Sequence, residues 1–258
     1  MTKRNIVYIV GDKFAEFARN SGVLTLENFE KTLESASQEI HHNTIFVAGQ
    51  GLQDHRVATL EKKIANLGLS NHILFLAQPV ERATNWMTHK ERLENIMISS
   101  PIKISECEFH AKIILDDLCA EMSDHMTGQH IQGVVLLEAA RQMFLAVTSI
   151  FFLKPEKRSQ YYFALNSFSV DFVNFAFALE IEIRYHIRNM SDDGNGNISF
   201  AVDMELYQAG TKTTDIKVSF AAYKGIYMRL VESSKAKEAL ERAQSNAHKM
   251  DDAMATAN

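Results

Sequence analysis

Cysteine and extended basic segments are scarce in this sequence, and both absences limit the class of protein. The two cysteines, Cys107 and Cys119, are too few for a disulfide framework and lack the CxxC spacing of many metal or redox sites. The formal net charge is -5 and no basic run occurs, so the chain lacks the electrostatic footprint of a nucleic-acid-binding protein. We therefore expect a reduced protein that does not bind nucleic acid.

Signals for targeting and for metal binding are also missing. The apolar run near the N-terminus is interrupted at Gly11-Asp12-Lys13 and no small-residue cleavage pattern follows it. We therefore expect no signal peptide and a cytoplasmic protein. His41-His42, His55 and His89 have no neighbouring metal-ligand pattern. The sequence predicts neither a metal site nor a cofactor.

One long apolar segment dominates the rest of the chain. After a polar loop that starts at Ser123, about twenty residues up to Leu153 are apolar on nearly every side, and a helix of that kind is buried in protein or in lipid. Its length would just span a bilayer. However, Glu138, Arg141 and Gln142 would be costly near the membrane centre, and no second apolar span exists to shield them. We expect a helix buried inside a soluble protein and no membrane span.

Strands are predicted on the C-terminal side of this helix, because apolar and polar residues alternate there with period two. The expected core residues are Leu179, Ile181, Ile183, Tyr185 and Ile187, then Phe200, Val202, Met204 and Leu206, then Ile216, Val218, Phe220 and Ala222. A mixed pattern over 102–115 predicts one further strand before the loop. A long apolar helix followed by long antiparallel strands indicates a sheet wrapped around that helix.

Residues 5–80 alternate strand and helix patterns, which implies parallel pairing with right-handed crossovers. The predicted strands are Ile6–Val10, Thr44–Ala48 and Ile73–Ala77. The first helix between them carries Leu24, Phe29, Leu33 and Ala36, with Thr25 as its N-cap. The second helix carries Val57, Leu60, Ile64 and Leu67 and stops at Gly68. Strand ends in such sheets often hold ligands. Gly49-Gln50-Gly51, however, lacks the third glycine of a dinucleotide loop and the lysine of a phosphate loop. We therefore favour a structural or docking domain.

These patterns together predict an α+β protein in four parts. A small three-layer α/β (Rossmann-like) domain with a short parallel sheet covers 1–80, and a linker covers 81–100. The domain with the central helix and antiparallel sheet covers 101–228, and a C-terminal helical tail covers 229–258. The tail has only a narrow apolar stripe, so we expect a solvated helix without a chemical role.

The loop and the long helix also resemble a known family. The segment DHMTGQHIQGVVLLEAARQ, residues 124–142, resembles the signature of the A-factor biosynthesis (AfsA-type) hotdog family. Thr88-His89-Lys90, followed by LENIMISS, resembles the histidine-lysine segment that opens that family's domain. The likeness covers residues 88–226 and implies a hotdog fold. One position departs, because the family usually has proline before the glycine where this chain has Gln132.

The start of the long helix is suited to holding a thioester carbonyl. Backbone amides at a helix N-terminus are free to donate, and a glycine lets a carbonyl approach closely. We therefore expect Gly133 and Val134 to bind the carbonyl. Desolvation of Glu138 in its apolar surroundings would raise the pKa, whereas pairing with Arg141 would lower the pKa. The sequence leaves these two outcomes open.

A likeness to the dehydratase hotdogs, which use a loop histidine and an acid on the central helix, implies Glu138 and His125 as the first catalytic candidates. His130 is the next candidate, and Asp124 is placed to orient a histidine. Arg141 is a candidate for substrate binding. We expect Gln142 to satisfy backbone groups, with substrate binding as its alternative role.

Three functions fit this sequence. The family resemblance implies transfer of a β-ketoacyl group from an acyl carrier protein or CoA thioester to a phosphorylated three-carbon acceptor, in biosynthesis of a butyrolactone-type or related lipid signal. A dehydratase or thioesterase acting on similar thioesters is the second, and a non-catalytic, acyl-ligand-binding regulatory protein is the third. Basic residues at the pocket mouth (Arg141, Lys154, Lys157 and Arg158) would favour the first function. A pocket closed to solvent with Glu138 locked on Arg141 would favour the third. Because a single hotdog leaves an open sheet edge and an incomplete pocket, we expect a homodimer through the hotdog domain.

Overall fold

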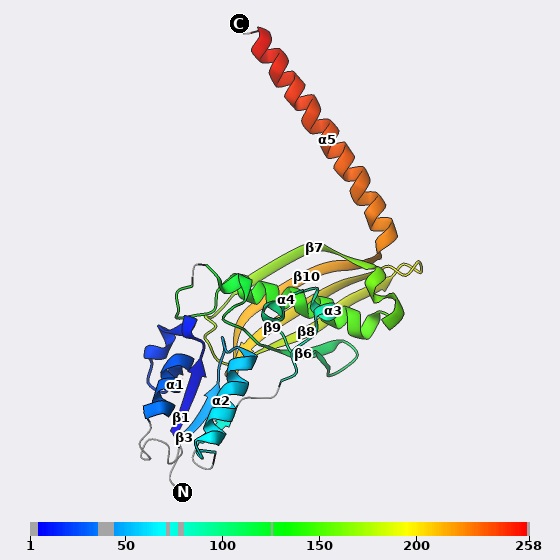
Figure 1. Ribbon diagram of the computed structural model, residues 1–258. Helices are drawn as coiled ribbons and strands as arrows, with labels where there is room; N and C mark the ends of the chain where they lie inside the picture. The colour runs from blue at the N-terminus through cyan, green and yellow to red at the C-terminus, as the bar shows by residue number, and fades with distance from the viewer. Residues whose placement is uncertain (1–4, 36–43, 71–72, 77–79, 125, 257–258) are drawn as a thin grey trace.

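The structure is a computed structural model that describes residues 5–35, 44–70, 73–76, 80–124 and 126–256. A small parallel α/β unit lies beside a larger unit in which a curved antiparallel sheet packs against one long helix, and a C-terminal helix projects away from both (Figure 1). The N-terminal unit contains β1 (Asn5–Val10), β2 (Val23–Thr25), α1 (Leu26–Ser35), β3 (Thr44–Ala48), α2 (Asp54–Asn66) and β4 (Ile73–Leu76).

The N-terminal sheet has the strand order β2-β1-β3-β4, and all its pairs are parallel. The three predicted strands are present, but the prediction for Leu24 was wrong. Leu24 lies in β2 rather than in the helix, because Val23–Thr25 pairs with the end of β1 and delays the helix start to Leu26. The predicted cap is confirmed, since the Oγ1 of Thr25 accepts a hydrogen bond from the Asn28 amide at 3.2 Å.

The two faces of this sheet pack against different partners. Both helices cover one face through a separate apolar cluster, which contains Ile9, Leu26, Phe29, Leu33, Phe46, Leu52, Leu60 and Ile64. On the other face, Val10, Phe14, Phe17 and Val23 belong to the main core of the larger unit. The two units therefore share a core, and the larger unit supplies the layer that covers the second face of the sheet.

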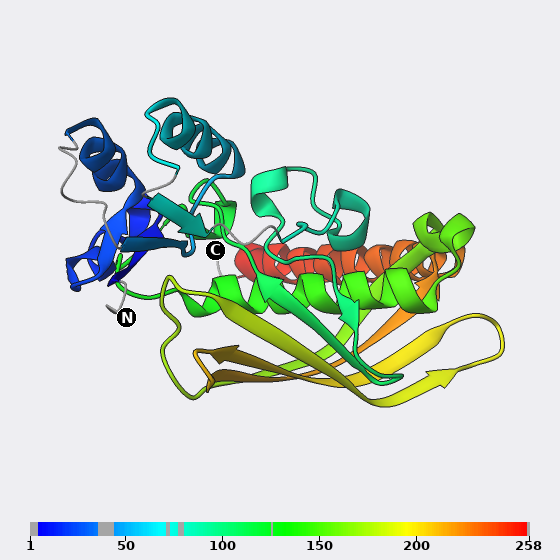
Figure 2. The same cartoon turned by 90° about the horizontal axis from the view of Figure 1, so that it is seen from below.

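The larger unit has a hotdog fold, with a sheet in the order β5-β6-β8-β9-β10-β7 that packs along the central helix α4 (Figure 2). Its elements are α3 (Asn85–Thr88), β5 (Ile102–Lys103), β6 (Glu108–Ile113), α4 (Gly133–Val147), β7 (Tyr161–Phe172), β8 (Ile181–Asp192), β9 (Ile198–Gln208) and β10 (Thr211–Lys224). Strand pairing is antiparallel throughout. The predicted core faces of β8, β9 and β10 are buried, which confirms the period-two interpretation.

Two features of this sheet differ from the sequence prediction. The single strand expected over 102–115 is a hairpin of β5 and β6, because the Ile104 and Ser105 amides both donate to the Glu108 carbonyl and reverse the chain. β7 was not predicted at all. It is an edge strand with little alternation in burial, so its sequence carries no clear period of two.

The central helix is buried, as the sequence predicts. α4 continues at its C-terminal end into a π-helical turn, Thr148–Phe152. Among the described residues, Gly133–Phe152 is the one helix long and apolar enough to cross a membrane, and 67% of its most apolar window is buried inside the protein. That extent of burial is typical of the core helix of a folded domain.

The C-terminal helix α5 (Gly225–Thr256) begins four residues before the predicted tail and extends into solvent (Figure 1). Its first turns stay close to the edge strand, since the Tyr162 hydroxyl donates to Glu232 Oε1 at 2.5 Å. Beyond that point the residues up to 250 are exposed, except for the half-buried Glu238. The expectation of a solvated helix is confirmed for these residues.

Candidate functional site

One flank of α4 lies between the edge strand β7 and the segment that contains α3. Val134, Glu138 and Arg141 are four and three residues apart, so they share this side of the helix. The strand β7 borders the flank at both ends. Phe172 packs directly on Gly133, where an added Cβ would lie 2.6 Å from the phenyl ring, and Phe163 lies at the other end.

Glu138 is the centre of an ion-pair network on this flank. Its two oxygens accept hydrogen bonds from Arg141, from Nε at 2.7 Å and from Nη2 at 2.9 Å. Lys90 Nζ lies 2.9 Å from Glu138 Oε1, and the Gln142 amide donates to the same oxygen at 3.0 Å. The side chain of Glu138 is only 14% exposed, so this carboxylate is buried but fully partnered.

These partners decide the protonation of Glu138. Desolvation acts to raise the pKa of Glu138, but the hydrogen bonds from Arg141 and Gln142 and the positive charges of Arg141 and Lys90 hold the pKa below its ordinary value. Of the two outcomes that the sequence left open, pairing with Arg141 is the one that occurs, and the pKa is lowered. Glu138 is therefore ionised near neutral pH, where it pairs with two cations and is not a ready proton donor.

Lys90 joins this network to a second carboxylate. Its ammonium lies 2.8 Å from Glu121 Oε1, in the loop that leads to α4, and the two carboxylates raise the pKa of Lys90 against the opposing effect of burial. The second oxygen of Glu121 is buried and has no hydrogen-bond partner among the described residues. The network thus contains two cations and two carboxylates from three segments that are distant in the sequence.

His89 lies next to this network in an uncommon backbone conformation. Its φ of 56° is in the left-handed region, as the C-cap of α3, and such conformations often mark functional positions. Its ring meets Phe163 edge-on, with the centroids 5.4 Å apart. Although the residue is exposed overall, desolvation of the ring and the charge of Arg141 lower the pKa of His89. The imidazole is therefore neutral at pH 7 and able to accept a proton.

Gln142 satisfies backbone groups, as the sequence analysis expects. It is fully buried, its Oε1 accepts from the Met97 amide at 2.8 Å, and its Nε2 donates to the Asn95 carbonyl at 2.8 Å. These bonds fix the segment that follows α3 on the side of α4. Gln142 thereby helps to place His89 and Lys90 beside Glu138.

The family model for the A-factor biosynthesis hotdog domain (AfsA) matches residues 72–223. The chain belongs to this family. A search of curated proteins gave no match. The part before residue 72 lies outside the family domain, so the AfsA hotdog carries the whole ion-pair network described above.

Solved structures resemble this AfsA protein only distantly. A mutant thioesterase from Pseudomonas aeruginosa is 12% identical, with a TM-score of 0.37 over 48% of this chain and 80% of that one. A thioesterase from Haemophilus influenzae is 9% identical, with a TM-score of 0.36 over 50% of this chain and 79% of that one. A protein from Helicobacter felis is 13% identical, with a TM-score of 0.35 over 53% of this chain and 98% of that one.

The other predicted site residues of the AfsA hotdog lie at the N-terminal end of α4. The described contacts of His130 are with Thr127 Oγ1 at 3.3 Å and with the ring of Phe175 at 5.0 Å, not with Glu138. The carbonyl of Asp124 accepts a hydrogen bond from Gln132 at 3.1 Å. Gly133 begins the helix beneath Phe172, and Val134 is 53% exposed. His125 lies outside the described residues.

His89, Lys90 and Glu121 were not predicted as site residues. The signal for the first two was available, because Thr88-His89-Lys90 is one of the two segments that resemble the family. The structure shows that this segment and the helix segment from Glu138 to Gln142 are neighbours in space. No pattern in the sequence pairs Glu121 with Lys90.

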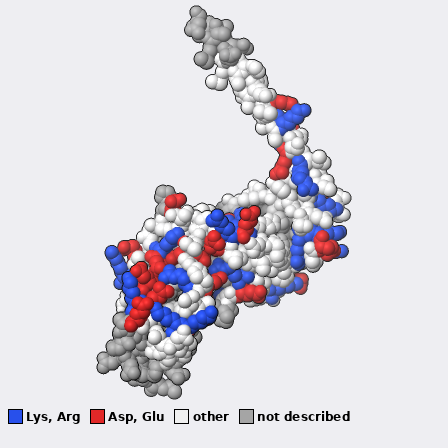
Figure 3. Space-filling view, viewed as in Figure 1, with Lys and Arg blue, Asp and Glu red and all other residues white. Residues whose placement is uncertain are grey.

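Figure 3 shows acidic and basic side chains mixed over the visible face of the N-terminal unit, without a patch of one sign. Within the described ranges, no group of three or more histidine, cysteine, aspartate or glutamate side chains is placed to hold a metal ion.

Part of the carboxyl edge of the parallel sheet, where related sheets bind ligands, is occupied by the hotdog unit at Gly11 and Gly51. Asp117 inserts its carboxylate between Gly11 and Gly51, where an added Cβ would lie 2.3 Å and 2.5 Å from Asp117 Oδ1. Gln50 fixes the adjoining chain, accepting from the Leu115 amide at 2.8 Å and donating to the Ile113 carbonyl at 3.0 Å. A nucleotide phosphate would have to displace Asp117 to reach these glycines.

Proposed function

We propose that this AfsA protein is an acyltransferase that moves a β-ketoacyl group from a carrier-protein or CoA thioester to a hydroxyl acceptor. The observation that carries the proposal is the meeting of a neutral, exposed histidine with an ordered arginine on one open flank of the central helix. Family membership supports chemistry in A-factor-type biosynthesis. A butyrolactone-type or related lipid signal is the product class that fits.

In this mechanism His89 is the general base. It takes the proton of the acceptor hydroxyl while that oxygen attacks the thioester carbonyl, and the tetrahedral intermediate then expels the thiolate. The thiolate receives the proton from His89, so the new ester and the free thiol account for all atoms. A base must be unprotonated at working pH, which agrees with the lowered pKa of His89.

Arg141 is the residue that would bind an anionic group. Glu138 fixes its guanidinium with two hydrogen bonds, yet 36% of the side chain is exposed toward the flank. A planar guanidinium with free N–H groups suits a phosphate, so Arg141 fits a phosphorylated three-carbon acceptor. Glu138 acts through Arg141 as a positioning residue. Gly133 and Val134, the predicted carbonyl site, lie beneath Phe172 at the other end of the flank, about 12 Å along α4 from Arg141, so they do not hold the carbonyl that His89 would serve.

A homodimer through the hotdog unit forms part of this proposal. β7 pairs only with β10 among the described strands, so its outer edge is unpaired. Leu165 and Phe172 on this strand are 52% and 53% exposed, and Phe172 lies at the candidate site. Pairing of two copies along β7 would cover both the edge and the flank. Elution at a monomer mass near 29.2 kDa would refute this part.

A second candidate function is an acyl-ligand-binding regulatory protein without catalysis. The observation in its favour is that Glu138 is ionised and bound by Arg141, Lys90 and Gln142, as a structural residue would be. In that case the flank would hold an acyl ligand and His89 would only contact it.

Mass spectrometry of the full chain with a β-ketoacyl carrier-protein thioester, with and without dihydroxyacetone phosphate, separates these functions. We expect acyl transfer that requires the acceptor and falls by about 100-fold or more in His89→Ala, the effect typical of losing a general base. Arg141→Lys should raise KM for the phosphorylated acceptor more than it lowers kcat, because a lysine does not reproduce the bidentate donor.

His248→Ala on α5 serves as the matched histidine control, because it lies on the projecting helix away from the flank. Free acid or loss of water without an acceptor would assign a thioesterase or dehydratase instead. A retained acyl ligand with no turnover would assign the regulatory protein.

A further inference from the structure

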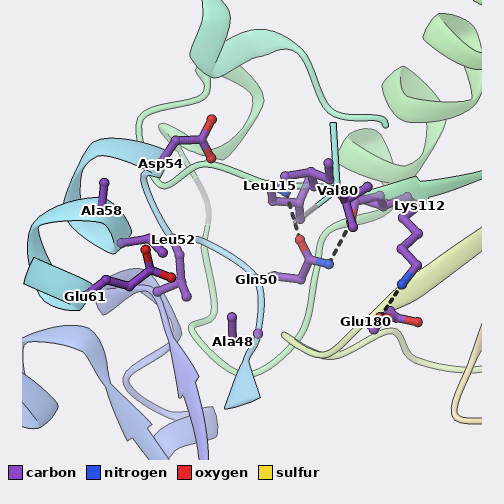
Figure 4. Close-up of a pocket in the computed structure, with 14 residues that line it drawn as sticks. Ala48, Gln50, Leu52, Asp54, Ala58, Glu61, Val80, Lys112, Leu115 and Glu180 are labelled. Atoms are coloured by element: carbon purple, nitrogen blue, oxygen red, sulfur yellow. Dashed lines mark hydrogen bonds and ion pairs between the residues drawn. The ribbon is translucent and has the colours of Figure 1, made fainter. Parts of the chain in front are cut away.

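A cavity lies at the junction of the two units, away from the α4 flank. It opens at the end of β3 and is bounded by α2 on one side and by the end of β6 and Glu180, the residue before β8, on the other (Figure 4). Its volume is about 370 Å³. This position, outside the carboxyl ends of a parallel sheet, is where such sheets bind ligands, and the volume is in the range of small-molecule sites.

The walls of the cavity are mainly apolar. They are formed by Ala48, Leu52, Val57, Ala58, Val80 and Leu115. Gln50 at the back is 5% exposed, and its amide is already bound to backbone groups of the hotdog unit, so it offers no free donor. The body of any occupant is therefore apolar.

The mouth of the cavity is acidic. Asp54, Glu61 and Glu180 stand at it with a single cation, Lys112. Two of the carboxylates are already neutralised, since Lys112 pairs with Glu180 at 2.9 Å and Arg82 pairs with Asp54 at 3.1 Å. Glu61 has no ion-pair partner among the described residues, and Figure 4 shows it beside Leu52 at the cavity.

The charge pattern continues in an adjoining cavity of similar volume, which shares Val80 and Lys112 with the first. His110 in that cavity lies between two carboxylates, 2.8 Å from Glu108 and 2.8 Å from Glu182. The two adjoining cavities thus combine apolar walls with an excess of carboxylates.

We propose that the junction cavity binds a small apolar molecule with a protonated amine, its apolar body against Leu52 and Val57 and its ammonium group at Glu61. An anionic ligand is disfavoured by the carboxylates at the mouth. Acyl acids, phosphates and CoA, the chemistry suited to Arg141 on α4, are disfavoured for the same reason. The junction cavity is therefore a second site, with a different ligand class from that of the proposed acyl-transfer site.

Calorimetric titration of the full chain with three six-carbon probes tests this site. We expect hexylamine to bind, hexan-1-ol to bind about two- to fivefold more weakly because it lacks the ion pair with Glu61, and hexanoate not to bind. Glu61→Gln should weaken hexylamine by the same factor and leave hexan-1-ol unchanged. Ala58→Phe places a ring in the cavity from an exposed helix position, and it should weaken both binders by about tenfold or more.

Glu241→Gln on α5 is the matched control, because its carboxylate is exposed and lies on the projecting helix. Thermal unfolding of each variant verifies that it is folded. Hexanoate binding as tightly as hexylamine would overturn the proposal, as would hexylamine binding that is unchanged in Ala58→Phe. No detectable binding of hexylamine would also overturn it. None of these readouts depends on acyl transfer.

Discussion

Two buried carboxylates of the hotdog unit, Glu138 and Asp117, differ in what surrounds them. Glu138 meets an arginine, a lysine and an amide, and its pKa is held below the ordinary value. Asp117 meets only backbone amides, those of Lys13 at 3.4 Å and of Asp12, and its Oδ1 is buried without a hydrogen-bond partner. Burial, together with the nearby charge of Asp12, raises the pKa of Asp117 to about 6.

The difference shows that burial alone does not fix the behaviour of an acid. Desolvation acts on both groups in the same direction, and the cationic partners decide the outcome. Glu138 therefore belongs to an arrangement that depends on its charge. Asp117 destabilises the fold while it is charged, yet it occupies the edge of the N-terminal sheet and closes that edge to other anions.

The largest expected effect follows from removing Glu138. Glu138→Ala leaves Arg141 and Lys90 without their shared partner, and breaking a buried pair in this way costs about 3 kcal/mol of unfolding free energy. Urea-induced unfolding measures the loss. Glu241→Ala on the exposed helix is the control and should change stability by less than about 0.5 kcal/mol. A loss below about 1 kcal/mol would show that the network does not support the fold.

Asp117→Asn should have the opposite effect and raise the unfolding free energy at neutral pH. A pKa raised from 3.8 to about 6 means that the folded state binds the proton of Asp117 more tightly than the unfolded state does. The stabilisation from this proton is fully present below pH 3.8 and is lost as the pH rises to about 6. A shift of two units corresponds to about 3 kcal/mol, and the neutral amide should recover about 2 kcal/mol of this at pH 7.5.

Urea unfolding of the parent protein and of Asp117→Asn between pH 4 and pH 7.5 measures the difference in their unfolding free energies. This difference should disappear toward pH 4. Asp124→Asn, at an exposed loop position, is the matched control and should show no such difference. A variant that is less stable than the parent at pH 7.5 would mean that Asp117 is held by a partner other than those described.

The sequence predicted the hotdog unit well because its elements are defined by burial. Strand positions such as Ile183 and Val202 alternate with polar residues, and the apolar length of α4 admits only a buried helix. β7 and the β5–β6 hairpin were missed because an edge strand and a tight turn leave weak patterns. The placement of Asp117 against the N-terminal glycines depends on tertiary packing, which local patterns do not encode.

The candidate site was predicted in part. Glu138 and Arg141 are three residues apart on one helix, so their pairing was one of two outcomes visible in the sequence. Lys90 and Glu121 meet across 31 residues of sequence, and nothing local indicates that contact. The direction of the pKa shift of Glu138 depends on Lys90 as well as on Arg141, so it required the fold.

The smallest expected effect concerns the pKa of His89. It separates the effect of desolvation from the effect of a neighbouring charge, which act together on Glu138 and Asp117. Desolvation is the larger cause of its lowered pKa and the charge of Arg141 the smaller one. NMR titration of the imidazole should therefore give a midpoint below 6.5, and Arg141→Gln should move the midpoint upward without restoring it fully. Because the unfolded chain binds this proton more readily, the contribution of His89 to stability falls as the pH drops below 6.5. A complete return to 6.5 in Arg141→Gln would make charge the sole cause, and the ring would then be as well solvated as a histidine in an unfolded chain.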